Sequence, residues 1–233
     1  MTSDAIRIED LHHAWPGGPP LFHIPSFELK AGESMFLAGP SGSGKSTLLG
    51  LIAGITPVQS GRIEVLGRIM DAKRPAERDR VRADEIGMIF QLFNLVPYLS
   101  PVENVMLPLH FSPARRSKID AAGIRPDEEA DRLLKALGLD AEQIARPASK
   151  LSVGQQQRVA AARALIGSPG LIIADEPTSA LDEDSRDNFL DLLSKEARHS
   201  GASLLFVSHE RSLAARFDQR VELDDLNQLR SAA

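Results

Sequence analysis

The stretch GPSGSGKS, Gly39 to Ser46, decides the fold class of this chain. Glycines let the backbone curl so that successive N–H groups point at one anion, and a helix that follows adds its positive end. Lys45 supplies a charge to the phosphate, and the Ser46 hydroxyl can ligate Mg²⁺. The pattern therefore predicts a phosphate-binding loop whose ligands are Gly39, Pro40, Ser41, Gly42, Ser43, Gly44, Lys45, Ser46 and Thr47.

A second stretch, LIIADE (Leu171 to Glu176), places two acids after a continuous apolar run. Such a run is typical of a buried parallel strand, and acids at its end lie where open α/β sheets bind ligands. We expect Asp175 to hold Mg²⁺ through water opposite Ser46, and Glu176 to orient and deprotonate an attacking water. The alternative is a pair of helix-capping acids, which the preceding phosphate loop disfavours.

Two further polar residues follow apolar strand patterns. His209 follows Ser203 to Val207, and we expect it to hydrogen-bond the γ-phosphate or the attacking water. Gln91 closes Ile86 to Phe90, where it can reach both Mg²⁺ and the water. A lone histidine is more often structural than catalytic, and Gln91 alone would be an ordinary polar residue at a strand end; only the order of the motifs favours catalysis. His12 and His13 are adjacent in a strand and face opposite ways, so they form a poor metal-binding pair.

Two sites suggest contacts at other parts of a nucleotide. Trp15, the sole tryptophan, lies in a Pro/Gly-rich loop and could stack on adenine, with a core position as the alternative. The segment LSVGQ, Leu151 to Gln155, opens a helix and places the Ser152 hydroxyl and the Gly154 N–H at a positive helix end. Because one phosphate loop is already present, this second anion site suggests a ligand held by another copy of the chain.

The hydrophobic pattern predicts a single nucleotide-binding α/β domain over residues 1–233, interrupted by helices. The α/β core covers about 1–91 and 166–233, and the helical part covers about 92–165. We expect an edge strand at Ile6 to Leu11, a loop at Ser112 to Pro126, and a final antiparallel edge strand around Val221 and Leu223.

Composition narrows the class of protein further. The chain has 233 residues, a formal net charge of −5, a pI near 5.7 and no cysteine. The acidic balance gives no sign of a nucleic-acid partner, and the absence of cysteine removes disulfide and thiolate chemistry. The N-terminal segment lacks the apolar core of a signal peptide, and no stretch is long enough for direct membrane insertion. We therefore expect a chain that is soluble by itself.

Taken together, these motifs resemble those of the ATP-binding-cassette (ABC) ATPases over essentially the whole chain. The resemblance implies a P-loop NTPase core with a mixed sheet, an antiparallel β subdomain and an inserted helical subdomain. It also implies ATP and Mg²⁺ as cofactors and a head-to-tail homodimer that holds two ATP molecules. Each site would join two copies of the chain. One copy would contribute Lys45, Gln91, Glu176 and His209, and the other would contribute Leu151 to Gln155, the signature segment. The loop between the two sites would contain Ser179, Ala180, Leu181 and Asp182.

The segment from Ile86 to Leu109 resembles the branch of lipoprotein-release, macrolide-export, haem-export and cell-division ATPases. This likeness implies an integral membrane permease as partner and a peripheral location on the cytoplasmic face of the inner (plasma) membrane. The transported substrate would be a lipid, lipoprotein, peptide or hydrophobic drug. The uncharged run Leu92 to Leu99 is expected to contribute to the docking surface for the permease.

One departure from the family pattern lies at Val153, where the usual sequence is LSGGQ. A β-branched residue disfavours positive φ, so we expect Val153 at negative φ with activity retained.

The resemblance implies an ATP-hydrolysing, energy-coupling subunit of a membrane ABC transporter or mechanotransmission complex, in which ATP-driven dimerisation drives the membrane partner. Two other functions remain open, a soluble ABC ATPase of DNA repair or translation and a nucleotide-binding regulator without turnover. The absence of long insertions argues against the first, and the presence of Glu176 and His209 argues against the second.

Overall fold

A computed structural model describes residues 4–70 and 74–231. By their internal contacts these residues form two compact units. The first runs up to Arg82 and resumes at Ser203, and the second is Ala83–Ala202. Helix α2 (Pro75–Glu85) crosses the boundary between them. The expected bounds of the helical part, about 92 and 165, stay a prediction, because the units group elements by contact and not by type.

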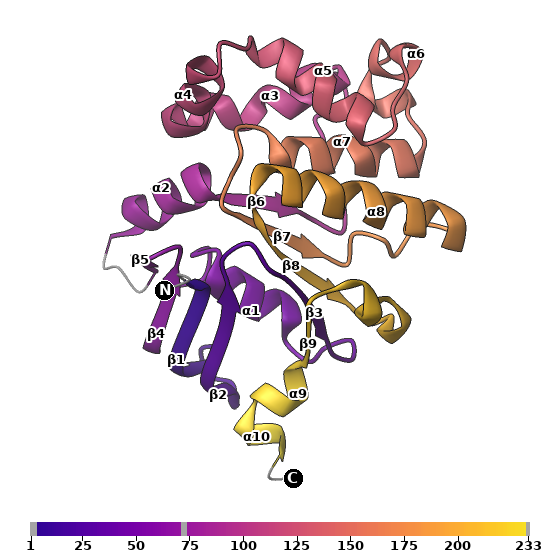
Figure 1. The fold of residues 1–233 in the computed structure, drawn as a ribbon. Helices are drawn as coiled ribbons and strands as arrows, with labels where there is room; N and C mark the ends of the chain where they lie inside the picture. The colour runs from indigo at the N-terminus through magenta and orange to yellow at the C-terminus, as the bar shows by residue number, and fades with distance from the viewer. Residues whose placement is uncertain (1–3, 71–73, 232–233) are drawn as a thin grey trace. The chain divides into compact units, whose positions relative to one another are not determined.

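The first unit contains an antiparallel sheet in the order β2-β1-β4-β5 (Figure 1). Its strands are β1 (Asp4–Ala14), β2 (Pro20–Lys30), β4 (Ser60–Val65) and β5 (Arg68–Ile69). Alternate side chains of β1 and β2 are buried, as a half-buried sheet requires. The expectation of an edge strand at Ile6 to Leu11 was wrong, because β1 pairs with β2 on one side and β4 on the other.

Three parallel strands complete the sheet structure of the first unit. They are β3 (Ser34–Ala38), β8 (Ser203–Ser208) and β9 (Gln219–Glu222), and β3 pairs with both of the others. The prediction of an antiparallel final strand was therefore wrong. The short stretch between β8 and β9 contains only the 3₁₀ helix η2 (Arg211–Arg216), which returns the chain to run parallel to β3.

Besides α2, the described part of the first unit has one α-helix after the phosphate loop and two near the end of the chain, and the latter replace the strand expected at Leu223. Helix α1 (Lys45–Ile52) begins inside the phosphate loop, and it buries Leu48, Leu49, Leu51 and Ile52. Helices α9 (Leu223–Leu226) and α10 (Gln228–Ser231) contact β2. The buried Asn227 between them accepts from the His23 N–H and donates to the Leu21 carbonyl, which ties this segment to β2.

The second unit contains two parallel strands and most of the helices. Strand β6 (Ile86–Ile89) pairs with β7 (Leu171–Asp175), in register at Ile89 and Ala174. Between these strands, every regular element is helical. Besides the end of α2, the helical elements of the unit are α3 (Pro101–Phe111), α4 (Pro113–Ala121), α5 (Pro126–Ala136), α6 (Ala141–Ile144), η1 (Ala148–Lys150), α7 (Val153–Leu165) and α8 (Glu183–Ser200).

The segment Ser112 to Pro126, expected as a loop, contains helix α4, so that expectation was wrong. Ser112 caps the helix by accepting from the Arg115 N–H, and Pro113 occupies the first helical position. Arg115 itself is buried and donates to the carbonyls of Ile86, Ala164 and Ile166. Burial lowers the pKa of Arg115 to about 10, so the guanidinium stays charged at neutral pH. These hydrogen bonds from Arg115 stabilise α4 although the local sequence has a poor helical pattern.

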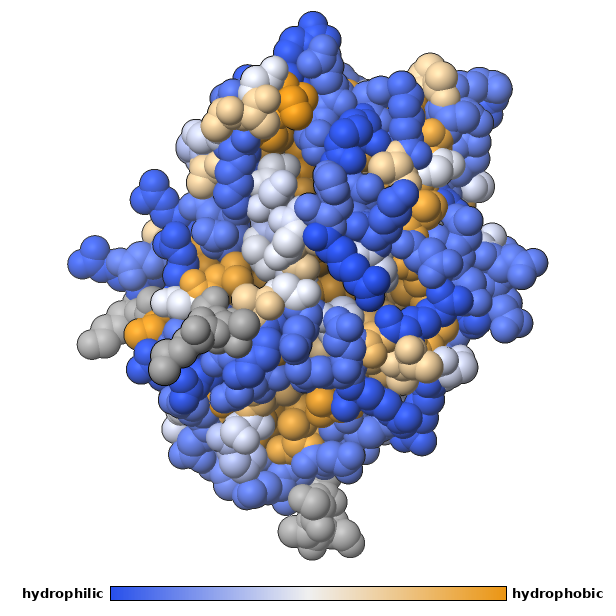
Figure 2. All heavy atoms as spheres, in the orientation of Figure 1, coloured by the Kyte–Doolittle hydropathy of each residue, from blue (hydrophilic) through white to orange (hydrophobic). Residues whose placement is uncertain are grey.

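Among the helices of the described residues, none combines the length and apolar character that a membrane crossing requires. The face drawn in Figure 2 is dominated by hydrophilic residues, with apolar side chains scattered among them.

The strands and helices together make an α/β fold with antiparallel and parallel sheets and many helices, which confirms the predicted class.

Candidate nucleotide site

The phosphate loop joins the end of β3 to α1 in the first unit. Gly42 and Gly44 have φ of 77° and 100°, and these positive values turn the backbone around the loop. A Cβ at Gly39 would lie 2.9 Å from the Ser43 Oγ, and one at Gly44 would lie 2.8 Å from the Phe22 ring. The left-handed backbone therefore requires glycine at Gly42 and Gly44, and Gly39 lies too close to the Ser43 hydroxyl for a side chain unless that hydroxyl moves.

Two side chains of the loop fit a phosphate ligand. Lys45 is 6% exposed, and its Nζ donates to the carbonyls of Gly39 (2.8 Å) and Pro40 (3.0 Å), so the ammonium lies over the loop. The Ser43 hydroxyl is buried without a hydrogen-bond partner among the described residues. A buried polar atom without a partner is costly, and a phosphate oxygen would satisfy it.

His209 lies beside the phosphate loop. Strands β3 and β8 are parallel and in register at Ala38 and Ser208, so the residues that follow them, Gly39 and His209, emerge side by side. The imidazole is exposed. This is the position that the sequence predicts for a residue that contacts the terminal phosphate.

Trp15 follows β1 in the same unit, at the turn before β2. It is 51% exposed, which argues against a core position. Its ring meets the buried ring of His13 edge to face, with centroids 5.2 Å apart. A half-exposed indole that contacts a buried ring on one side can still stack on an aromatic ligand.

The acids and Gln91 come together in the second unit. Because β6 and β7 are parallel neighbours, Gln91 and the pair Asp175 and Glu176 leave the same edge of the sheet. Glu176 has a φ of 45°, which is uncommon outside glycine. Such strain is found at functional sites, where surrounding structure holds the residue in place.

The loop after Gln91 is held by two side chains that the sequence analysis missed. Asn104 is fully buried, and its amide accepts from the Val96 N–H at 2.8 Å and donates to the Val96 carbonyl at 3.0 Å. Arg163 donates to the carbonyl of Asn94 at 2.7 Å, and it also donates to that of Phe93. An asparagine on an apolar helical face was the only available signal in the sequence. The loop itself keeps Leu92 and Tyr98 exposed, at 82% and 81%.

The signature segment forms the start of α7. Ser152 is the N-cap residue and makes a capping box with Gln155. Val153 begins the helix and does not have positive φ; it is 49% exposed. The negative φ that the sequence predicts for Val153 is therefore confirmed.

The segment expected to lie between two nucleotide sites is next to the signature segment. A Cβ at Gly154 would lie 3.4 Å from the Leu181 side chain. Asp182 caps α8, and the backbone N–H of Ser185 lowers the pKa of that carboxyl. Leu151, by contrast, is buried and has a packing role.

The candidate residues therefore fall into two groups, one in each compact unit. The first unit contains Trp15, the loop from Gly39 to Thr47, and His209. The second unit contains Gln91, the segment Leu151–Gln155, Asp175, Glu176 and the segment Ser179–Asp182.

These two groups, on this fold, define a P-loop ATPase of the ATP-binding-cassette class. The family model described as "ABC transporter" matches residues 22–179. The lipoprotein-releasing system ATP-binding protein LolD of Ruegeria sp. is 35% identical over 97% of both chains. That of Hydrogenovibrio crunogenus is 39% identical over 97% of this chain and 96% of its own. A solved structure described as a dimeric post-hydrolysis state of the ATP-binding cassette MJ0796, bound to ADP and Pi, has a TM-score of 0.81 and 31% identity, with 93% of each chain covered.

The chain belongs to the ABC transporter family, in which it is an ATP-hydrolysing, energy-coupling subunit. Its near relatives in sequence are the lipoprotein-releasing ATP-binding proteins.

Proposed function

We propose that this chain drives the release of lipoproteins from a membrane, as the ATPase of a complex with an integral membrane permease. The observation that carries the proposal is its end-to-end similarity to two lipoprotein-releasing ATP-binding proteins, over at least 96% of each chain. Lipids, peptides and hydrophobic drugs are the other substrate classes that the resemblance of Ile86 to Leu109 leaves open.

The local geometry of each unit supports the catalytic roles in this proposal. Lys45 and the N–H groups of the loop bind the phosphates and offset their charge. Glu176 takes a proton from the attacking water, and His209 hydrogen-bonds the terminal phosphate. Gln91 orients the water and links the site to the loop that follows.

Mg²⁺ fits the oxygen donors that these residues offer. The Ser46 hydroxyl, the Gln91 amide oxygen and, through water, the Asp175 carboxylate would hold it, since Mg²⁺ prefers oxygen ligands and keeps several of its waters. When bound, the ion offsets negative charge on the phosphates as the bond to the leaving group breaks.

The working form in this proposal is a homodimer with two ATP molecules. Each nucleotide contacts the phosphate loop of one copy and Ser152 and Gly154 at the start of α7 of the other. The dimeric state of the related cassette bound to ADP and Pi supports this arrangement. ATP binding closes the dimer, hydrolysis opens it, and the permease follows that motion.

The permease would dock at the loop Leu92–Leu99 and hold the chain at the cytoplasmic face of the inner membrane. Two large apolar side chains of the loop, Leu92 and Tyr98, are exposed and favour a partner at this surface.

Two experiments test this function. Affinity purification of the chain from detergent-solubilised cells should recover one integral membrane protein in fixed ratio. Recovery of ribosomes or DNA instead would favour a soluble ATPase of translation or repair. The purified complex, reconstituted in vesicles that carry a lipoprotein, should then release that lipoprotein only with ATP. Export of a drug without lipoprotein release would reject the proposed substrate.

A further inference from the structure

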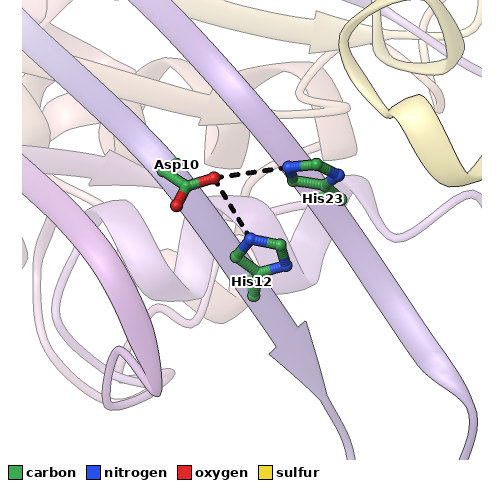
Figure 3. Close-up of side chains that lie close together, drawn as sticks. All are labelled: Asp10, His12 and His23. Carbon is green, nitrogen blue, oxygen red and sulfur yellow. Dashed lines mark hydrogen bonds and ion pairs between the residues drawn. The ribbon is translucent and has the colours of Figure 1, made fainter.

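Three potential metal ligands that the nucleotide site does not use lie together on the exposed face of the β1–β2 hairpin. Figure 3 shows Asp10 and His12 on β1, and His23 on β2, with their side chains pointing toward one another. The Asp10 Oδ1 is 3.1 Å from the Nε2 of His12 and 3.3 Å from the Nε2 of His23. The sequence does not reveal this group, because its members are brought together only by strand pairing.

The two histidines are direct cross-strand partners. His12 and His23 are in register in the antiparallel pair, where side chains on one face lie close together. Their rings stack with centroids 4.2 Å apart and an interplanar angle of 17°. The side chains are 47% and 28% exposed, so both rings have room to tilt toward a shared ligand.

A break in the strand alternation adds the carboxylate to this face. Between the pairs Glu9–Arg62 and His12–Ser60, two residues of β1 stand opposite Gly61 alone, which is the pattern of a β-bulge. Asp10 is the extra residue and has a φ of 47°. As a result Asp10 and His12 are both exposed, while Leu11 between them is buried.

The opposite strand is shaped for this bulge. Gly61 has a φ of 88°, and a Cβ there would lie 2.2 Å from the Asp10 carbonyl oxygen. Only glycine therefore lets β4 approach the backbone that places the Asp10 carboxylate beside the two rings.

We propose that Asp10, His12 and His23 bind one divalent transition-metal ion of the zinc class. A tetrahedral ion about 2.1 Å from each ligand atom separates those atoms by about 3.4 Å, close to the two N–O distances observed. The three candidate ligand atoms all lie within 4.8 Å of one another. Two imidazoles and one carboxylate suit Zn²⁺, Ni²⁺ and Cu²⁺, whereas Mg²⁺ prefers oxygen ligands.

Water would complete the coordination. His12 and His23 line a hollow of about 340 Å³ that also borders Gln59 and Ser60, so solvent can reach the ring nitrogens. The ion would join β1 to β2 and so restrain the hairpin.

The test is Zn²⁺ binding by isothermal titration calorimetry, with full-length protein that has no polyhistidine tag and in excess Mg²⁺. The Mg²⁺ saturates oxygen-rich sites, such as the one proposed at Ser46 and Asp175. We expect one high-affinity equivalent in the wild type. We expect His12→Gln and His23→Gln each to weaken binding at least about 10-fold, since loss of mere supporting groups already costs that much.

Two variants separate ligation from other effects. Asp10→Asn should also weaken binding, and asparagine tolerates positive φ, so the bulge is kept. His110→Gln removes an exposed histidine at the end of α3 and should bind Zn²⁺ as the wild type does.

A second measurement does not rely on heat. Cobalt(II), used as a probe, should give visible absorption bands that only the wild type and His110→Gln show, and no cysteine is present to contribute. Unchanged Zn²⁺ affinity in His12→Gln and His23→Gln, or no uptake by the wild type, would overturn the proposal. ATP turnover is not a readout, so this result is independent of the proposed transporter function.

Discussion

The carboxylate of Glu176 is the residue on which the chemistry of the proposed site depends. We expect Glu176→Gln to bind ATP but to lose the general base, with turnover falling about 10²–10⁴-fold. Because glutamine keeps the size of the side chain, ATP should accumulate in the closed dimer. Phosphate release measures the chemistry, and light scattering after size exclusion, with and without Mg-ATP, measures the dimer.

The control for this variant is Glu142→Gln, which removes an exposed carboxylate that pairs with Arg146 on the surface. It should hydrolyse ATP at the wild-type rate. Near-normal turnover in Glu176→Gln would instead transfer the role of base to Asp175 or His209.

Trp15 provides a second prediction at the scale of a residue. Because it is the only tryptophan and is half exposed, its fluorescence reports its own surroundings. Titrating Mg-ATP into the Glu176→Gln protein should change the emission as adenine covers the ring. A Lys45→Ala variant, with weakened phosphate binding, should need more nucleotide. Constant emission at saturation, with binding verified by equilibrium dialysis, would place adenine elsewhere.

Among the elements, α4 buries two side chains, Arg115 and Ile119, and of these Arg115 makes the hydrogen bonds to other parts of the chain. Arg115→Met removes the donors to the carbonyls of Ile86, Ala164 and Ile166 and should lower the free energy of unfolding by about 2–3 kcal/mol. Arg116→Met is the matched control, since Arg116 is exposed and pairs with Asp120 on the surface; we expect less than about 0.5 kcal/mol. Chemical denaturation measures both. Equal effects of the two substitutions would mean that the buried hydrogen bonds of Arg115 contribute nothing to the free energy of unfolding.

The loop Leu92–Leu99 gives the second prediction at this scale. Leu92→Glu and Tyr98→Glu should abolish assembly with the membrane partner while ATP binding is retained, because both side chains are exposed and neither belongs to the phosphate loop. Phe111→Glu is the control, with an equally apolar side chain that is 76% exposed outside the loop. Co-purification from membranes measures assembly. Loss of assembly in Phe111→Glu alone would move the docking surface to α3.

Local sequence predicted the elements whose signals are themselves local. The phosphate loop, the apolar strands β7 and β8 and the negative φ of Val153 all follow from short-range backbone and burial rules. The helix α4 did not, because its stability depends on contacts between Arg115 and residues far along the chain. The parallel direction of β9 and the interior place of β1 also depend on distant pairing.

The same division applies to the candidate sites. Motif order was sufficient to predict the protein family, and the family comparison agrees with it; the roles of the individual nucleotide residues stay a prediction. The left-handed backbone of Glu176, the support from Asn104 and Arg163 and the pairing of His12 with His23 are properties of the folded chain. The alternation along a strand predicts which face of the sheet a side chain lies on. It does not predict which residue of the neighbouring strand lies opposite.

At the scale of the whole molecule, the proposed dimer predicts complementation between two inactive variants. Lys45→Ala removes the charge of the phosphate loop, and Gly154→Asp adds a negative charge where the second copy should contact the phosphate. Asp is favourable in the first turn of a helix, so α7 should still form. Mixed dimers would have one complete site and one that is damaged twice.

Each variant alone should be inactive, whereas the mixture should recover about a quarter of wild-type turnover, since half of randomly formed dimers are mixed. Phosphate release from co-refolded or co-expressed subunits measures the recovery. An inactive mixture would indicate that each copy builds its nucleotide site alone.

The positive φ of Glu176 has a consequence for how this protein can change. A residue other than glycine in that conformation costs of order 1–3 kcal/mol, so the fold would be more robust with glycine there. Selection for thermal robustness and selection for turnover therefore pull in opposite directions at this one position. A redesign guided only by stability would replace the proposed base with glycine. The resulting protein would be more stable but would no longer hydrolyse ATP.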